Sequence, residues 1–186
     1  KLRASGLDPK LLAARGADTV LRMVLEHGYF HADPHPGNIL FLPENRICII
    51  DFGMVGMLTN PRRNQIVDML HALTLKDEQA MLQVLLDWSG ESVSDEDRLA
   101  YDVTELLQNY DDLQLKDVKI GALLNDVTAL MRDNNLMLPA DLTLLFKTLI
   151  TLEGLGLQLN PEFHMIDHVT PFVEHVIKQR YTPQAL

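Results

Sequence analysis

The stretch that decides the fold is HADPHPGNILFLPENRICIIDFG, residues 31–53. Two prolines and a glycine exclude regular structure from its first third, so residues 29–38 are predicted to form a loop. Two short β-rich runs follow, residues 39–42 and 46–50, and the turn signal Pro-Glu-Asn separates them. The sequence therefore predicts a loop and then a β-hairpin, whose second strand runs into Asp51.

Three polar side chains in this stretch have the spacing that phosphoryl transfer requires. Asp33 and Asn38 are five residues apart, as are the catalytic Asp and the metal-binding Asn of the kinase catalytic loop. Asp51 follows Asn38 by thirteen residues, and a hairpin of that length can return the chain so that the two lie together. Mg²⁺ prefers hard oxygen ligands, and the acceptor needs a further carboxylate as base or orienting group. The spacing supplies this set.

The same segment resembles the UbiB/AarF family of atypical kinase-like proteins (the ABC one/ADCK group). The resemblance is carried by GYFHADPHPGNIL, residues 28–40, and by IDFGMVG, residues 50–56. A less specific likeness continues through residues 154–163. The resemblance implies a protein-kinase-like fold, ATP binding and a link to ubiquinone (coenzyme Q) biosynthesis. It implies ATP hydrolysis, or phosphorylation of a small or lipid-like molecule, as the activity.

By this resemblance, Asp33 takes the role of the catalytic-loop aspartate, while Asn38 and Asp51 hold Mg²⁺. His35 is a candidate contact for the nucleotide phosphates, with a structural role as the alternative. His31 is expected to brace the loop by hydrogen bonds to the backbone. A zinc site built from the alternating His-x-Asp-x-His pattern is a weaker hypothesis, because no second ligand cluster lies nearby in the sequence.

The family's nucleotide-clamping lobe has no match in this sequence: neither its alanine-rich phosphate loop nor its Lys-x-Gly-Gln segment is found. Only 30 residues precede His31, too few for that lobe. We therefore interpret residues 1–186 as one C-lobe of a larger protein, inactive by itself. The predicted fold class is mainly α (α+β), with a small β-hairpin between the catalytic loop and Asp-Phe-Gly and a helical bundle behind it.

Helix signals occupy the rest of the chain, and Glu153 is expected to have a structural role at the end of a buried helix. Arg62 and Arg63, in a first helical turn, are expected either to pair with a carboxylate or phosphate or to be solvated. The helices are predicted as follows: one capped by Asp18 or Thr19 and ending before Gly28, one after Asn60-Pro61, one from Asp77 to about Trp88, one after Ser94–Asp97, residues 118–132, residues 140–152, and one opened by Thr170-Pro171.

The composition is that of a globular domain, with 47% hydrophobic and 23% charged residues. A net charge of -10 gives no general attraction for nucleic acid. The single cysteine, Cys48, excludes an internal disulfide and is expected to be buried. Because Lys147 and Glu153 interrupt the most apolar stretch, residues 142–157, no membrane span is predicted and the piece is expected to be soluble.

For the intact protein, the resemblance implies the bacterial inner membrane or a mitochondrial or plastid compartment. It implies quinone-biosynthesis proteins and membrane lipids as partners. Two alternatives stay open. A small-molecule phosphotransferase of the aminoglycoside or choline kinase type shares the loop, but commonly carries Gly at the place of Ala32 and Trp at the place of Phe52. A nucleotide-binding regulatory module without catalysis is the other.

Overall fold

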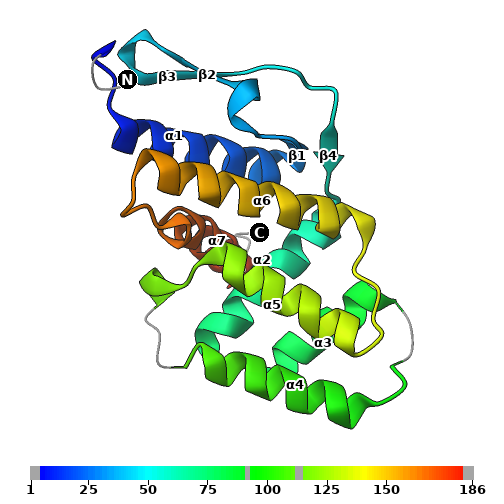
Figure 1. Cartoon of the computed structure of the whole chain (residues 1–186). Coiled ribbons are helices and arrows are strands. Elements are labelled where there is room, and N and C mark those ends of the chain that lie inside the picture. The colour runs from blue at the N-terminus through cyan, green and yellow to red at the C-terminus, as the bar shows by residue number, and fades with distance from the viewer. Residues whose placement is uncertain (1–4, 91–92, 112–114, 182–186) are drawn as a thin grey trace, which may run out of the picture.

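The computed structural model describes residues 5–90, 93–111 and 115–181. Helices dominate, and two antiparallel two-stranded sheets lie at one end of the molecule (Figure 1). The predicted fold class, mainly α with a small β-hairpin, is confirmed at this level. The elements, in chain order, are α1 (Pro9–Arg22), a π-helical turn (Met23–His27), β1 (Tyr29–His31), β2 (Ile39–Leu42), β3 (Arg46–Ile49), β4 (Val55–Met57), α2 (Asn60–Leu75), α3 (Glu78–Ser89), α4 (Glu96–Asn109), α5 (Ile120–Asp133), α6 (Ala140–Leu159) and α7 (Met165–Tyr181).

The helices are layered around α6, which packs against α1 on one side and α5 on the other (Figure 1). The hairpin β2–β3 lies along α1, on the side of the molecule away from α5 (Figure 1). Helices α2, α3, α4 and α5 pack on one another in chain order and close the bundle. Their buried faces form one continuous hydrophobic core, to which α1 and α7 also contribute.

The long helix α6 lies at the centre of this core. Its 20 residues are long and apolar enough to cross a membrane by length and composition alone, although only 44% of the apolar window is buried. The core helix of a bundle passes the same test. Leu142 and Leu145 are fully buried, and Glu153 is 9% exposed. The sequence predicted a helix over residues 140–152, but the helix continues to Leu159, with Lys147 exposed on its surface and Glu153 inside the packing.

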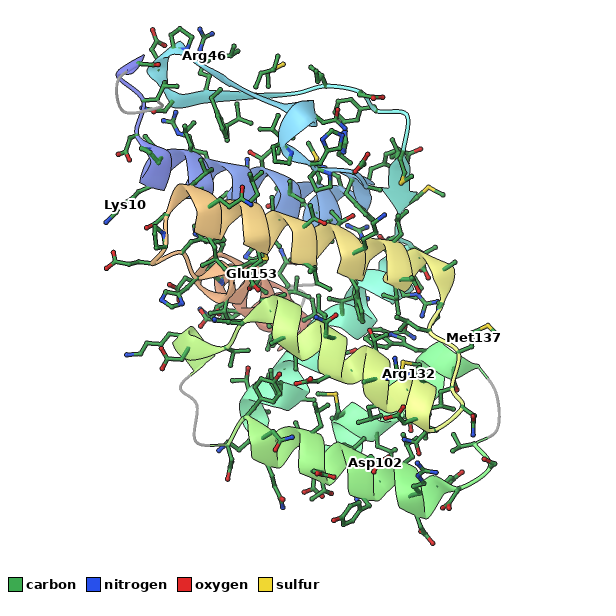
Figure 2. The ribbon with its side chains drawn as sticks, in the orientation of Figure 1. Lys10, Arg46, Asp102, Arg132, Met137 and Glu153 are labelled. Atoms are coloured by element: carbon green, nitrogen blue, oxygen red, sulfur yellow. The ribbon has the colours of Figure 1, made fainter. Side chains whose placement is uncertain are left out.

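Glu153 reaches across from α6 to the start of α5 (Figure 2). Its two carboxylate oxygens accept hydrogen bonds from the backbone N–H of Ile120 at 2.8 Å and of Gly121 at 3.0 Å. Lys119, the residue before α5, makes no side-chain capping bond. The carboxylate therefore satisfies the free N–H groups of α5 and lies at the positive end of its dipole. This confirms the structural role predicted for Glu153.

Several predicted helix ends are correct and others are not. Asp77 and Gly90 bound α3 as expected. The first helix begins much earlier than predicted, because Asp8 caps it through the backbone N–H of Lys10 and Leu11 and places Asp18 within the helix. Helices α2 and α4 are capped by Thr59 and Asp95 in place of Asn60 and Ser94. Pro171 lies inside α7 and does not open it, because Val169 and Val173 pack into the core on either side.

Candidate active site

A short antiparallel ribbon joins the two loops that carry the candidate residues. Strand β1, which precedes Asp33, pairs with β4, which follows Asp51. The ladder is extended by the backbone N–H of Ala32, which donates to the carbonyl of Met54 at 3.0 Å. The prediction of a loop over residues 29–38 is therefore wrong at its start, because residues 29–31 form a strand whose partner lies far along the chain. This pairing places the segment after β1 beside the segment before β4.

The predicted hairpin is confirmed, with its second strand one residue shorter than expected. Ile39 faces Ile49 across the ladder, and beyond it the N–H of Ile50 donates to the carbonyl of Asn38 at 2.9 Å. This last bond fixes the residue before Asp51 against Asn38. The hairpin thus returns the chain as the spacing had predicted.

The side chain of His31 makes hydrogen bonds to both loops and holds them together. Its side chain is fully buried, and its Nε2 lies 3.0 Å from the carbonyl oxygen of Ile50 and 2.9 Å from that of Asp51. Its Nδ1 accepts the backbone N–H of Asp33 at 3.1 Å. Because Nδ1 accepts and Nε2 must donate, the neutral ring with hydrogen on Nε2 satisfies every contact. The predicted bracing role is confirmed, and neither nitrogen is left for a zinc ion.

Asn38 and Asp33 are connected through the backbone of the loop. Asn38 is 6% exposed, and its Nδ2 donates to the carbonyl of Asp33 at 3.1 Å. Since the amide nitrogen is used in this way, the amide oxygen is the atom left to face a ligand. The carboxylate of Asp33 is half-exposed, so it is held in position by its backbone while its oxygens stay accessible.

His35 lies beside the Asp33 carboxylate, with Nε2 3.7 Å from Oδ2. Its Nδ1 accepts the backbone N–H of Gly37 at 3.0 Å, which leaves Nε2 as the nitrogen that points to the carboxylate. Both side chains are 48% exposed. The imidazole can therefore turn toward a ligand at the mouth of the loop without leaving a buried group unpaired.

Asp51 adopts a left-handed backbone conformation, with φ of 56°. Asp and Asn tolerate this region better than most residues. Its Oδ1 accepts the N–H of Gly53 at 3.3 Å, and the side chain is otherwise exposed. Phe52 packs edge-on against the ring of His31, with centroids 4.9 Å apart. The backbone turn and this ring contact together aim the carboxylate away from the core.

The donor chemistry at this place fits Mg²⁺. An exposed carboxylate from Asp51 and an amide oxygen from Asn38 are hard oxygen ligands, held on adjacent loops. Among the residues that the structure describes, no three His, Cys, Asp or Glu side chains converge on one point. A cation here would therefore depend on Asn38 and on oxygens supplied by a bound phosphate, as Mg²⁺ commonly does.

The hairpin adds an apolar surface that the sequence analysis missed. The side chains of β2 and β3 alternate, and the inner set, which includes Ile39 and Ile47, packs toward α1 and α6. The outer set is apolar as well: Leu40 is 45% exposed, and Ile50, just past β3, is 39% exposed. Cys48, opposite Leu40, is only half-buried, which corrects the expectation of a buried thiol. Continuous hydrophobicity in both strands was the signal available.

The two arginines at the start of α2 both have partners. Arg62 pairs with the carboxylate of Asp141 at 2.8 Å, which confirms the expectation of a carboxylate partner for this arginine. Arg63 fits neither expectation, because it donates to the carbonyls of Leu25 and Glu26 in the π-helical turn that follows α1. The chain then turns at Gly28, with φ of 68°, where a Cβ would lie 2.5 Å from the carbonyl of Leu58. Arg63 thus fixes the point from which the chain enters β1.

Comparison with known proteins places this chain in a family. The family model described as the ABC1 atypical kinase-like domain matches residues 1–85, and the UbiB helical domain matches residues 103–164. Similar proteins include the probable protein kinase UbiB of Azotobacter vinelandii, 33% identical over 97% of this chain and 35% of its own length. The probable protein kinase UbiB of Pseudomonas putida is 32% identical over 96% and 34%.

A plant relative is the chloroplastic protein ACTIVITY OF BC1 COMPLEX KINASE 7 of Arabidopsis thaliana, which is 30% identical over 96% of this chain and 26% of its own length. The chain thus spans about a third of the length of the bacterial relatives and a quarter of the plant one. Both family models and these relatives agree with one another. The chain belongs to the ABC1/UbiB family of atypical kinase-like proteins.

Proposed function

We propose that this chain carries the catalytic and metal-binding loops of an ATP- and Mg²⁺-dependent atypical kinase or ATPase, as its kinase-like C-lobe. One observation carries the proposal: the β1–β4 ribbon and the buried His31 hold Asp33, Asn38 and Asp51 on adjacent loops. Such an arrangement suits phosphoryl transfer, because in that reaction the protein mainly positions the reactants and stabilises negative charge on the phosphates.

Each residue has a role in this proposal. Asn38 and Asp51 would hold Mg²⁺, which when bound neutralises charge on the nucleotide phosphates and orients them. Asp33 accepts a proton from the phosphoryl acceptor or orients that acceptor. Its half-exposed carboxylate can reach the acceptor, and hydrogen bonds at its backbone N–H and carbonyl hold the residue in place. His35 offers its Nε2 to a phosphate oxygen, at the cost only of its long contact with Asp33.

The outer face of the hairpin suits the base of the nucleotide. Leu40 and Cys48 face each other across the ladder, and with Ile50 they form an apolar surface next along the chain to Asn38 and Asp51. The planar base of the nucleotide is stabilised by apolar contact with such a surface, whereas the phosphates of the nucleotide require the polar loops at the edge of that surface. The rest of the phosphate clamp would come from parts of the protein that this chain, a third of its bacterial relatives' length, does not span.

The names of the relatives support a proposal for the biological setting of the intact protein. Two of them are probable UbiB kinases and one is chloroplastic, so we place the intact protein in ubiquinone biosynthesis, at a bacterial inner membrane or in a mitochondrial or plastid compartment. Quinone-biosynthesis proteins and membrane lipids are the proposed partners, and a small or lipid-like molecule is the proposed acceptor.

The test is turnover of ATP by the intact protein with Asp33→Asn. Phosphate release and transfer should fall by at least about a hundredfold, the usual share of acid–base catalysis, with unchanged thermal stability. Asp87→Asn is the matched control, because Asp87 is exposed on α3 and, in the part of the chain that the structure describes, accepts a hydrogen bond from Gln83 of the same helix. Normal turnover in Asp33→Asn would refute the role.

Two other results would favour the alternatives. Nucleotide binding that depends on Mg²⁺, without turnover by the unmodified protein, would indicate a regulatory module. Efficient transfer to soluble amino sugars or to choline would indicate a small-molecule phosphotransferase.

A further inference from the structure

A groove with basic side chains lies away from the loops described above. It runs between the exposed side of α1 and the first residues of β3, and has a volume of about 620 Å³. Arg15 and Arg22 line the helix side and Arg46 the strand side, with His27 at one end. Three of the chain's arginines thus converge on one groove of a protein whose net charge is -10.

Two of these arginines carry uncompensated charge. Arg15 donates from one guanidinium nitrogen to the carbonyls of Glu44 at 3.0 Å and Asn45 at 2.7 Å. Arg46 donates through Nε to the carbonyl of Pro43 at 3.2 Å. Carbonyl groups orient a guanidinium but do not neutralise it, and among the described residues no carboxylate lies within ion-pair distance of either side chain. The remaining nitrogens of each fork stay available to an anion.

The acidic groups at the groove do not cancel this charge. Asp18 is the one carboxylate among the lining residues, and its Oδ1 is engaged by His168 of α7 at 2.8 Å. Glu26 lies 3.5 Å from Arg22, but both side chains are about half-exposed or more, so their attraction is weak. The groove is therefore a local positive site on an acidic surface.

We infer that this groove binds an extended acidic peptide segment of a partner protein, a function separate from the proposed phosphoryl transfer. The stretch of helix from Arg15 to His27 is roughly 18 Å long, which matches about five or six residues of extended chain. A concave groove admits such a segment between its two walls. An anionic membrane would face the whole acidic surface around the groove, whereas a peptide meets only the groove itself, so charge complementarity favours the peptide.

The experiment measures fluorescence anisotropy of labelled hexaglutamate with the intact protein at low salt. The variant is Arg22→Glu with Arg46→Glu, which reverses two charges of the groove and leaves Arg15 to brace the hairpin turn. The control is Arg98→Glu with Arg132→Glu, which changes the net charge equally at exposed sites on α4 and α5. Arg132 lies far from Arg46 (Figure 2). Thermal unfolding checks that both variants fold.

The groove variant should bind hexaglutamate at least about tenfold more weakly than the unmodified chain, and the control should bind as the unmodified chain does. Added salt should weaken binding, and labelled hexaserine should not bind. The inference is overturned if hexaglutamate does not bind, or if both variants lose affinity alike. It is also overturned if only phosphatidylglycerol vesicles bind in a way that the groove variant abolishes, which would assign the groove to a membrane surface. If the groove variant does not fold, Arg22→Gln alone gives the same comparison.

Discussion

Replacing His31 by phenylalanine tests how the two candidate loops are held together. Phenylalanine keeps the aromatic volume in a fully buried position and can keep the edge contact with Phe52. It removes both ring nitrogens. The backbone N–H of Asp33 then loses its acceptor, and the carbonyls of Ile50 and Asp51 lose a donor.

The magnitude follows from those contacts. A partly buried N–H left without an acceptor costs roughly 1–3 kcal/mol, and the lost donation to the carbonyls adds about 1 kcal/mol. The free energy of unfolding should therefore fall by about 2–4 kcal/mol. With a denaturant slope of about 2 kcal/mol per molar urea, the midpoint of unfolding falls by about 1–2 M.

Urea unfolding measures the loss of stability, and amide hydrogen exchange by NMR measures the loss of the hydrogen bond. The amide of Asp33 should exchange at least about tenfold faster in His31→Phe, because its one hydrogen bond is gone. His164→Phe is the matched control, since His164 is exposed and the same chemical change there should shift the midpoint little. A loss of less than about 0.5 kcal/mol with unchanged exchange of Asp33 would refute the reasoning.

Three further changes test the fold around the site. Glu153→Gln should lower the free energy of unfolding by about 2–3 kcal/mol in urea, because one of the two accepting oxygens becomes an NH2 group that faces a backbone N–H, and because the negative charge is lost; an unchanged midpoint would contradict this. Burial and the hydrogen bond to Asp126 raise the pKa of Tyr110, so stability should fall as pH rises above about 10, where the unfolded tyrosine ionises; Tyr110→Phe should reduce that fall in pH-dependent melting. Gly56→Ala should cost roughly 1–3 kcal/mol by thermal unfolding, because its Cβ would lie 2.1 Å from Phe30; wild-type stability would show that the ring can move.

Local signals predicted the hairpin and the ends of α3 correctly. The hairpin followed from two β-rich runs around a turn, and its length predicted that Asp51 would return to Asn38. Both ends of α3 were predicted because Asp77 and Gly90 make hydrogen bonds to residues three or four positions away in the same helix. Features of this kind depend on residues a few positions apart, so periodicity and turn chemistry are enough to find them.

Features that depend on distant residues were missed. Strand β1 has only three residues, and nothing local distinguishes it from loop; its ladder requires β4. The first helix was predicted to be capped by Asp18 or Thr19, yet Asp8 caps it and the residues before Asp18 are helical and pack on α6. The apolar outer face of the hairpin needed the strand register before Leu40 could be placed beside the carboxylates.

Binding of ATP to the intact protein, with and without Mg²⁺, tests the central claim most directly. The variant is Asp51→Asn, because asparagine suits the left-handed backbone at this position, removes the negative charge and replaces one carboxylate oxygen by an NH2 group that cannot bind a cation. By titration calorimetry, Mg²⁺ should tighten ATP binding to the unmodified protein, and this gain should be lost in Asp51→Asn with the melting temperature unchanged. An equal gain from Mg²⁺ in both proteins would contradict the assignment of Asp51, and with it the site built on Asp33, Asn38 and Asp51.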